Sequence, residues 1–193
     1  MKQIFFMLLC IMFVTTYTNA QNTTDTATTK RKKVIVKTFT KKPAQAIYAE
    51  VGGNSLLWSL NYDRRFSNRL DGVGFRAGVG YFPLGGSNLL VVPFGINILA
   101  GNKGHFVEMG LNATVVSASS KNKSAPTVSK FGQLDFTGNK TNMLYGASMG
   151  YRYQKPDAKG FHFRAGVEPI LGNRYDDKMV FAITGHISIG YSF

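Results

Sequence analysis

The chain is poor in cysteine and in acidic residues, and it has no long apolar run. Its 193 residues include a single cysteine, Cys10, and 10 Asp and Glu residues against 23 Lys and Arg residues. One cysteine excludes a fold held by intramolecular disulfides. The longest apolar run, Ile4 to Val14, has about eleven residues, well short of the roughly twenty that a membrane-spanning helix needs. The sequence therefore does not predict a helical membrane protein.

The first twenty residues have the pattern of a secretory signal peptide. Lys2 precedes the apolar run, and Thr18-Asn19-Ala20 supplies short side chains where a signal peptidase would cut. We expect Met1 to Ala20 to be removed on export. Cys10 lies too near the start to be a lipidation cysteine, so the mature chain has no cysteine. That composition suits a bacterial envelope protein that enters an oxidising compartment without disulfides.

Residues 21–43 are predicted to form a disordered basic tail in the periplasm. Gln21 to Lys42 is rich in threonine and carries seven Lys and Arg residues against one Asp. Nucleic acid is the usual partner of such a segment, but an exported protein meets little of it, so no nucleic-acid partner is expected. Two interpretations stay open. The tail is either a solvated leader or a segment attracted to anionic lipid or cell-wall polymer.

From Ala44 onward the sequence shows no helical periodicity, and turn residues separate eight segments that read as strands. The last of them is the clearest: from Phe181 to Phe193 every odd position is apolar or glycine, and every even position is small or polar. This period of two is typical of a strand whose two faces meet different surroundings. The predicted strands are Gln45–Gly53, Ser55–Phe66, Val73–Phe82, Leu89–Ala100, His105–Ser117, Met143–Gln154, Gly160–Leu171 and Val180–Phe193.

These segments predict an all-β fold, an eight-stranded antiparallel up-and-down transmembrane β-barrel over residues 44–193, with its last strand paired to its first. Strands of this length suit a tilted crossing of a hydrocarbon layer. The connections expected on the periplasmic side, 67–72, 101–104 and 155–159, are short, whereas the opposite side has the longest, 118–142. Aromatic residues near both ends of the apolar face read as interfacial girdles: Trp58, Tyr62, Tyr81, Tyr151, Tyr153, Tyr191 and Phe193.

Two pairs of segments indicate an internal duplication. The first, Tyr48 to Asn54 and Phe106 to Asn112, shares the pattern aromatic-x-Glu-x-Gly-x-Asn. The second, Phe75 to Val79 and Phe163 to Val167, is identical as Phe-Arg-Ala-Gly-Val. In each pair the two copies lie four predicted strands apart. We therefore predict that a half-barrel of four strands was used twice.

The alternation turns seven charged side chains toward the barrel interior. An unpaired buried ion is costly, and loss of one partner of a buried pair costs about 3–5 kcal/mol. An eight-stranded lumen is just wide enough to be filled by side chains. We predict a structural network of ion pairs that fills it, with a ligand or ion path through the same residues as the alternative. The residues are Glu50, Asp63, Arg76, Glu108, Arg152, Arg164 and Glu168.

The signal peptide, the alternating strands and the ending Tyr191-Ser192-Phe193 together resemble the small outer-membrane β-barrel proteins of Gram-negative bacteria. Stretches similar to 48–54 and 59–66 recur in uncharacterised barrel proteins of Bacteroidetes, and the resemblance covers Ala44 to Phe193. It implies a location in the outer membrane, surrounded by its lipid. It also implies that Tyr191 and Phe193 belong to the signal that the barrel-assembly machinery reads. No reaction carries over from this family.

The sequence therefore predicts a non-enzymatic barrel, expected to be monomeric, that acts in envelope structure or surface interaction through its outer loops. One alternative is a lipid-modifying enzyme, because His186-Ile187-Ser188 is similar to the His-x-Ser of lipid A deacylases. No acidic residue follows that motif, however, and both side chains are expected to face inward. The other alternative is a narrow pore. We find no metal-ligand spacing, phosphate loop or nucleophile elbow, so no cofactor is expected.

Overall fold

The computed structural model describes residues 42–84, 87–120, 130–131, 134–135, 141–173 and 179–193. The predicted signal peptide and residues 21–41 of the predicted tail lie outside these ranges. Within the described ranges, no helix is long and apolar enough to cross a membrane.

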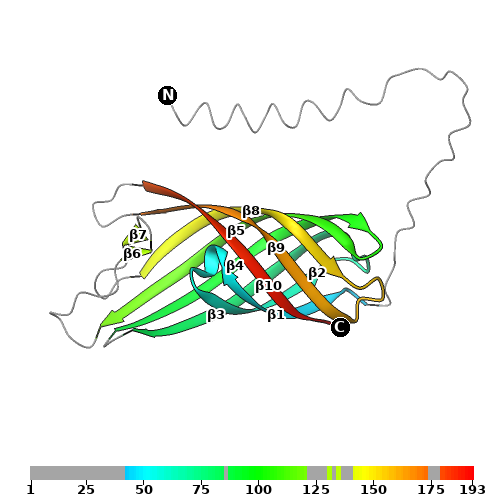
Figure 1. Ribbon diagram of the computed structural model, residues 1–193, viewed down its shortest axis with the longest axis horizontal. Coiled ribbons are helices and arrows are strands. Elements are labelled where there is room, and N and C mark those ends of the chain that lie inside the picture. The colour runs from blue at the N-terminus through cyan, green and yellow to red at the C-terminus, as the bar shows by residue number, and fades with distance from the viewer. Residues whose placement is uncertain (1–41, 85–86, 121–129, 132–133, 136–140, 174–178) are drawn as a thin grey trace, which may run out of the picture. The chain divides into compact units, whose positions relative to one another are not determined.

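Eight long strands close into an antiparallel barrel in the order β1-β10-β9-β8-β5-β4-β3-β2 (Figure 1). A separate two-stranded sheet lies between β5 and β8 in the sequence. The predicted eight-stranded all-β barrel is confirmed. The long strands are β1 (Gln45–Gly52), β2 (Trp58–Arg65), β3 (Gly72–Leu84), β4 (Ser87–Asn102), β5 (His105–Ser120), β8 (Thr141–Gln154), β9 (Gly160–Asn173) and β10 (Met179–Ser192); the short ones are β6 (Lys130–Phe131) and β7 (Leu134–Asp135).

The last strand closes the barrel against the first, as predicted. The register runs from Ala46 opposite Ser192 to Gly52 opposite His186. Just beyond it, the Phe193 N–H donates to the Gln45 carbonyl at 2.9 Å. This seam pairs two strand edges that an open sheet would leave exposed.

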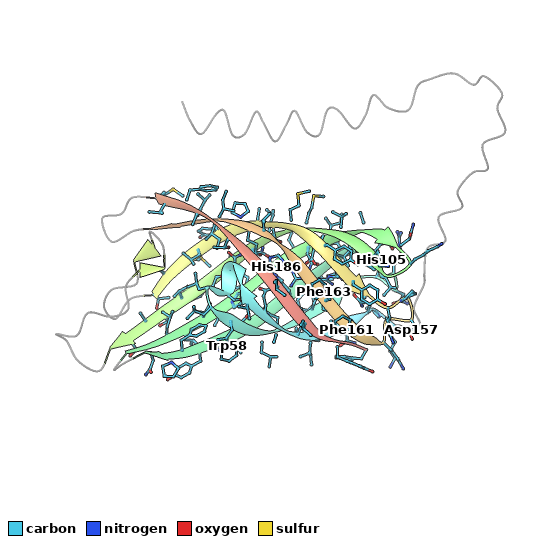
Figure 2. All side chains as sticks on the ribbon, viewed as in Figure 1. Trp58, His105, Asp157, Phe161, Phe163 and His186 are labelled. Carbon is cyan, nitrogen blue, oxygen red and sulfur yellow. The ribbon has the colours of Figure 1, made fainter. Side chains whose placement is uncertain are left out.

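Side chains alternate between an apolar outer face and a buried inner face along each strand. On β10, Ile183 and Ile187 are 67% and 57% exposed, whereas His186 and Ser188 between and beside them are buried. Figure 2 shows side chains projecting outward along the length of the barrel. A soluble barrel has the opposite arrangement. An apolar outer belt is stable where hydrocarbon surrounds it.

The two ends of the barrel differ. We call the end where β1 begins and β10 ends the terminal rim, and the opposite end the loop rim. Aromatic contacts gather at the terminal rim, where His105 and Phe161 are labelled in Figure 2. There the His105 Nδ1 lies 2.6 Å from the Tyr151 hydroxyl, and the rings of Tyr153 and Phe161 are 6.3 Å apart. Rings gathered at one end of a barrel are typical of the girdle that membrane barrels carry at a membrane–water interface.

The prediction that the second strand starts at Ser55 is wrong. Residues Gly53–Ser55 form a short 3₁₀ turn, η2, and β2 begins only at Trp58. The chain reverses there through positive φ angles at Gly53 and Leu56, and the Leu57 N–H donates to the Ser55 carbonyl at 2.8 Å to close a γ-turn. All three residues of η2 are buried. The turn therefore folds into the lumen, partway along the barrel (Figure 1).

We expect the seam to be sensitive to added volume at Gly190. A Cβ there would lie 2.1 Å from the Ile47 carbonyl oxygen, whereas a Cβ at Gly185 on the same strand would meet nothing nearer than the Gly166 carbonyl oxygen at 3.7 Å. Gly190→Val should lower the free energy of unfolding by about 2 kcal/mol or more, and Gly185→Val by less than about 0.5 kcal/mol. Urea unfolding followed by circular dichroism in detergent micelles measures both. Equal effects would contradict the closeness of β1 and β10 at Gly190.

Candidate functional site

All seven predicted interior charges are buried in the lumen, together with an eighth, Arg65. Four carboxylates therefore face four guanidinium groups, and their formal charges cancel. Balance is essential in a lumen this narrow, because each excess ion would be buried without a partner. The set consists of Glu50, Asp63, Glu108 and Glu168 with Arg65, Arg76, Arg152 and Arg164.

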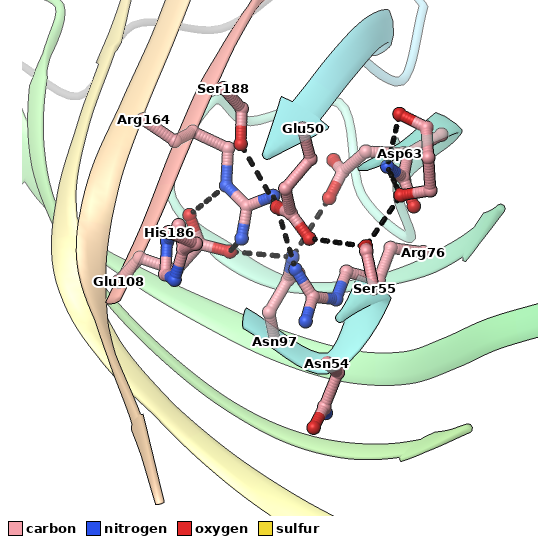
Figure 3. A network of polar contacts seen from close by, with 12 residues as sticks. Glu50, Asn54, Ser55, Asp63, Arg76, Asn97, Glu108, Arg164, His186 and Ser188 are labelled. Carbon is pink, nitrogen blue, oxygen red and sulfur yellow. Dashed lines mark hydrogen bonds and ion pairs between the residues drawn. The ribbon is translucent and has the colours of Figure 1, made fainter. Parts of the chain in front are cut away.

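Glu108 on β5 lies at the centre of the network. Its two carboxylate oxygens accept from Arg152 Nε and Nη2 at 2.9 and 3.0 Å, and from Arg164 Nε and Nη2 at 2.9 Å each. Both arginines thus bind in the two-pronged mode that fixes geometry as well as charge. Figure 3 shows Arg164 in contact with Glu108 inside the lumen.

Asp63 on β2 shares Arg152 with Glu108. Arg152 donates to its two oxygens at 3.1 and 2.9 Å, and Arg65 donates at 2.7 and 3.0 Å. The Asn97 amide bridges the two acids, since its nitrogen lies 2.8 Å from Asp63 Oδ2 and 3.0 Å from Glu108 Oε1. Arg65 also donates to the Asn97 carbonyl oxygen.

Glu50 on β1 connects the centre to the rest of the network. Arg164 donates to its Oε2 at 2.9 Å, and Arg76 at 3.4 Å. Two hydroxyls complete its surroundings: Ser188 donates to Oε2 at 2.9 Å and Ser55 to Oε1 at 3.2 Å (Figure 3). Arg164 also makes a cation–π contact, because its guanidinium carbon lies over the Tyr48 ring at 4.9 Å from the ring centre.

Glu168 on β9 binds the inserted turn. Its Oε1 accepts from Arg76 at 2.7 Å and from Asn112 at 2.9 Å. Its Oε2 accepts the backbone N–H of Asn54 at 2.6 Å. The charged acceptor Glu168 thereby fixes the η2 turn to β9, which lies 114 residues further along the chain.

The predicted repeat recurs in these contacts. β5 and β9 lie four strands around the barrel from β1 and β3, respectively. The pair Glu50–Arg76 joins β1 to β3, and the pair Glu108–Arg164 joins β5 to β9 in the same way. This correspondence is what a duplicated half-barrel would produce. The duplication itself stays a prediction.

Apolar side chains close the lumen on both sides of the charges. The layer toward the terminal rim is small, and the layer toward the loop rim is larger and includes Leu56 from the turn after η2. Both consist of residues at most 8% exposed, so the charged middle is shielded from each end. The terminal layer is Ala44, Leu70, Leu99, Phe106 and Ala158; the loop-side layer is Leu56, Phe82, Leu89, Val91, Val116, Ala118, Leu144, Ile170 and Val180.

The His186-Ile187-Ser188 motif does not form a histidine–serine pair. Both side chains are buried on the inner face, and the Ser188 hydroxyl donates to Glu50. The His186 Nδ1 lies 3.9 Å from Glu168 Oε2, beyond hydrogen-bond distance. Among the described residues, no group of three or more His, Cys, Asp or Glu side chains is placed to hold a metal ion.

Sequence reasoning missed Arg65, although its position was informative. It follows Asp63 by two residues, so the alternation places it on the same inner face. The structure shows how it fits: a Cβ at Gly74 on β3 would lie 2.3 Å from the Arg65 Cζ. A large cation opposite a strand glycine is the signal that could have identified it.

The two predicted assembly residues lie on the outer face at the terminal rim. Tyr191 is 57% exposed and Phe193 is 45% exposed. They take no part in the charge network.

Comparisons with known proteins show the fold and no closer relationship. No family model and no curated protein sequence matches the chain. The N-terminal β-barrel domain of Pseudomonas aeruginosa OprF superimposes with a TM-score of 0.52 at 12% identity, covering 79% of this chain and 98% of that one. Neisserial surface protein A gives 0.46 at 14% identity, covering 78% and 94%. Ail of Yersinia pestis, solved with the heparin analogue sucrose octasulfate, gives 0.35 at 18%, covering 79% and 99%.

These three are small outer-membrane barrels of Gram-negative bacteria. The OprF domain supports the eight-stranded barrel fold for this chain. The resemblance to Bacteroidetes proteins stays a prediction.

Glu108 should be the most sensitive position of the network. Glu108→Gln leaves Arg152 and Arg164 with a neutral partner, so we expect a loss of about 3–5 kcal/mol in the free energy of unfolding. The matched control is Asp71→Asn, which breaks the partly exposed pair with Arg69 and should cost less than about 1 kcal/mol. Urea unfolding in detergent micelles measures both. A small loss in Glu108→Gln would mean that the network does not hold the lumen together.

Proposed function

We propose that the protein is a non-enzymatic outer-membrane barrel that anchors its loops at the cell surface and acts in envelope structure or surface interaction. The observation that carries this proposal is the combination of an apolar outer belt with a lumen filled by balanced charges and closed by apolar layers. The belt suits the barrel to lipid. The filled lumen leaves the loops as the part that meets other molecules.

The proposed orientation follows from the predicted signal peptide. An exported chain inserting from the periplasm leaves the terminal rim, with its girdle of aromatic rings, on the periplasmic side. The predicted basic tail then lies in the periplasm, and the long connection between β5 and β8 faces outward. In this proposal Tyr191 and Phe193 are contacted by the assembly machinery during insertion. The mature barrel is a monomer in contact with outer-membrane lipid.

The filled lumen favours an anchor over a pore. An ion crossing the barrel would have to pass two apolar layers and separate guanidinium groups from carboxylates at 2.7–3.1 Å. Each such pair is hydrogen-bonded on several sides, so opening a path would break several contacts together.

We therefore expect the protein extracted from outer membranes to run faster on a gel before boiling than after, and to show no ion conductance in planar bilayers. The first result reports a folded barrel, and the second a closed lumen. An unshifted, water-soluble protein would contradict the membrane location. Conductance that changes in Arg76→Ala or Glu108→Ala would instead support a narrow pore.

The same proposal predicts no lipid A deacylation. Purified protein should release no fatty acid from lipid A, and Ser188→Ala should be indistinguishable from the unchanged protein. The reason is that the Ser188 proton points to Glu50 in the lumen. Deacylation that disappears in Ser188→Ala would replace this proposal with an enzyme.

A further inference from the structure

The barrel wall has a gap toward the loop rim. β1 and β2 have eight residues each, whereas β10 and β3, the strands that flank them in the barrel wall, have 14 and 13. Pairing between β1 and β10 ends at Gly52 opposite His186, so among the described residues 179–185 of β10 have no strand partner on that side. Pairing between β2 and β3 begins at Leu60 opposite Val79. Figure 1 shows β3 and β10 continuing past the point where the β1–β2 hairpin turns inward.

Within the part of the chain that the structure describes, the edge of β10 that borders this wall gap has backbone groups without a strand partner. Phe193 exchanges both backbone hydrogen bonds with Gln45, at 2.9 and 3.3 Å. Because such pairs alternate along an antiparallel ladder, Ile183 and Phe181 point their N–H and C=O groups to the same side, where β1 is missing. Across the gap, β3 carries Pro83, which has no N–H to leave unpaired.

The free edge reaches into the hydrocarbon region. The ten residue-to-residue steps from Phe181 to Tyr191 rise by about 25 Å along the membrane normal for a strand tilted by about 40°, close to the height of the apolar band of such barrels. With Tyr191 at the terminal interface, Phe181 lies at the opposite interface and Ile183 lies within the lipid. An unsatisfied backbone group there costs several kcal/mol. A bound molecule that forms hydrogen bonds with the backbone groups of this edge would remove that cost.

Directly beside the gap, the outer face carries an apolar groove of about 780 Å³. It has no acidic, lysine or arginine side chain in its lining. Its floor includes the buried His186, whose Nδ1 has no hydrogen-bond partner. The groove is lined mainly by Val51, Gly52, Ala165, Gly185, Ile187 and Ile189.

Gly185 leaves space for the groove by having no side chain, although the packing of the barrel would accept a side chain there. Among the glycines of the described strands, it is the one whose position in the alternation faces outward, between the exposed Ile183 and Ile187. A Cβ there would touch only the Gly166 carbonyl oxygen, at an ordinary 3.7 Å, whereas a Cβ at Gly166 would come 2.5 Å from the Met149 carbonyl oxygen. Glycine weakens a strand interior. Its presence where the fold has room for a side chain indicates that the space is used.

We propose that the groove and the free edge of β10 together bind one molecule of lipid A from the outer leaflet. An acyl chain lies in the groove over Gly185. Its amide linkage meets the backbone N–H and C=O groups of Ile183 and Phe181. This inference rests on the proposed outer-membrane location, which places the loop rim in the leaflet that holds lipid A.

The chemistry of the edge favours lipid A over other occupants. A free strand edge offers donors and acceptors together. The ester of a glycerophospholipid only accepts hydrogen bonds, whereas the amide-linked hydroxyacyl chains of lipid A both donate and accept. A polypeptide strand added to β10 would satisfy the edge too, but it would not need an outward glycine at 185. The uncharged lining of the groove also fits a hydrocarbon chain.

Native mass spectrometry of the full-length protein in detergent tests this proposal. The barrel is titrated with lipid A or with phosphatidylglycerol, for the unchanged protein, Gly185→Leu and Ala100→Leu. The last adds the same side chain to an exposed position of β4 away from the groove. We expect one lipid A per barrel for the unchanged protein and for Ala100→Leu, with weaker binding of phosphatidylglycerol. Gly185→Leu should bind lipid A at least about tenfold more weakly, the loss expected when roughly two methylene groups leave apolar contact.

Gel mobility before and after boiling, measured on the same samples, separates the two possible failures. Without a shift in the unchanged protein, the proposed membrane location fails, and this inference fails with it. With a shift in all three proteins, equal lipid A binding in Gly185→Leu overturns the site alone. Equal binding of phosphatidylglycerol overturns the choice of lipid A. A bound polypeptide mass in place of lipid overturns the choice of a lipid.

Discussion

The contact of one carboxylate, Glu108, with two guanidinium groups organises the barrel interior. Arg152 and Arg164 come from neighbouring strands, β8 and β9. Arg152 extends to Asp63 on β2, four strands around the barrel, and Arg164 extends to Glu50 on β1, two strands away. The side chains that neutralise one another therefore also tie opposite walls of the barrel together. Buried ion pairs add little net stability compared with apolar packing, but their loss is costly. The network accordingly specifies which strands face each other more than it lowers the energy of the fold.

The two apolar layers give this network its strength. A charge pair exposed to water contributes little, because solvent screens it and competes for its hydrogen bonds. Phe106 and Leu99 on one side, and Leu144 and Ile170 on the other, keep water from the ends of the lumen. The apolar outer belt likewise keeps water from the sides of the barrel when lipid surrounds it. The interior is thus a polar core enclosed on every side by apolar groups, the reverse of the usual order in soluble proteins.

The strands and most of the network could be predicted from the sequence, because a period of two fixes the face of every residue once one strand is placed. That single rule places Glu50, Arg76 and Arg164 inside, and Tyr191 outside. It failed where the chain leaves the strand conformation. The segment 55–58 reads as the start of a strand because Leu56, Leu57 and Trp58 are apolar. Its inward turn depends on positive φ at Gly53 and Leu56 and on an acceptor 114 residues away, Glu168.

The inward turn also makes closure and filling of the barrel a single step. η2 belongs to the hairpin whose first strand, β1, forms the seam with β10. While that seam is open, Asn54 has no fixed wall to meet, and the acid that accepts its N–H lacks one of its donors. When the seam closes, the hairpin brings Glu50 to Ser188 and Asn54 to Glu168 at the same time. The sealed barrel is therefore also the filled one, because the hairpin that completes the wall carries the turn that occupies the lumen.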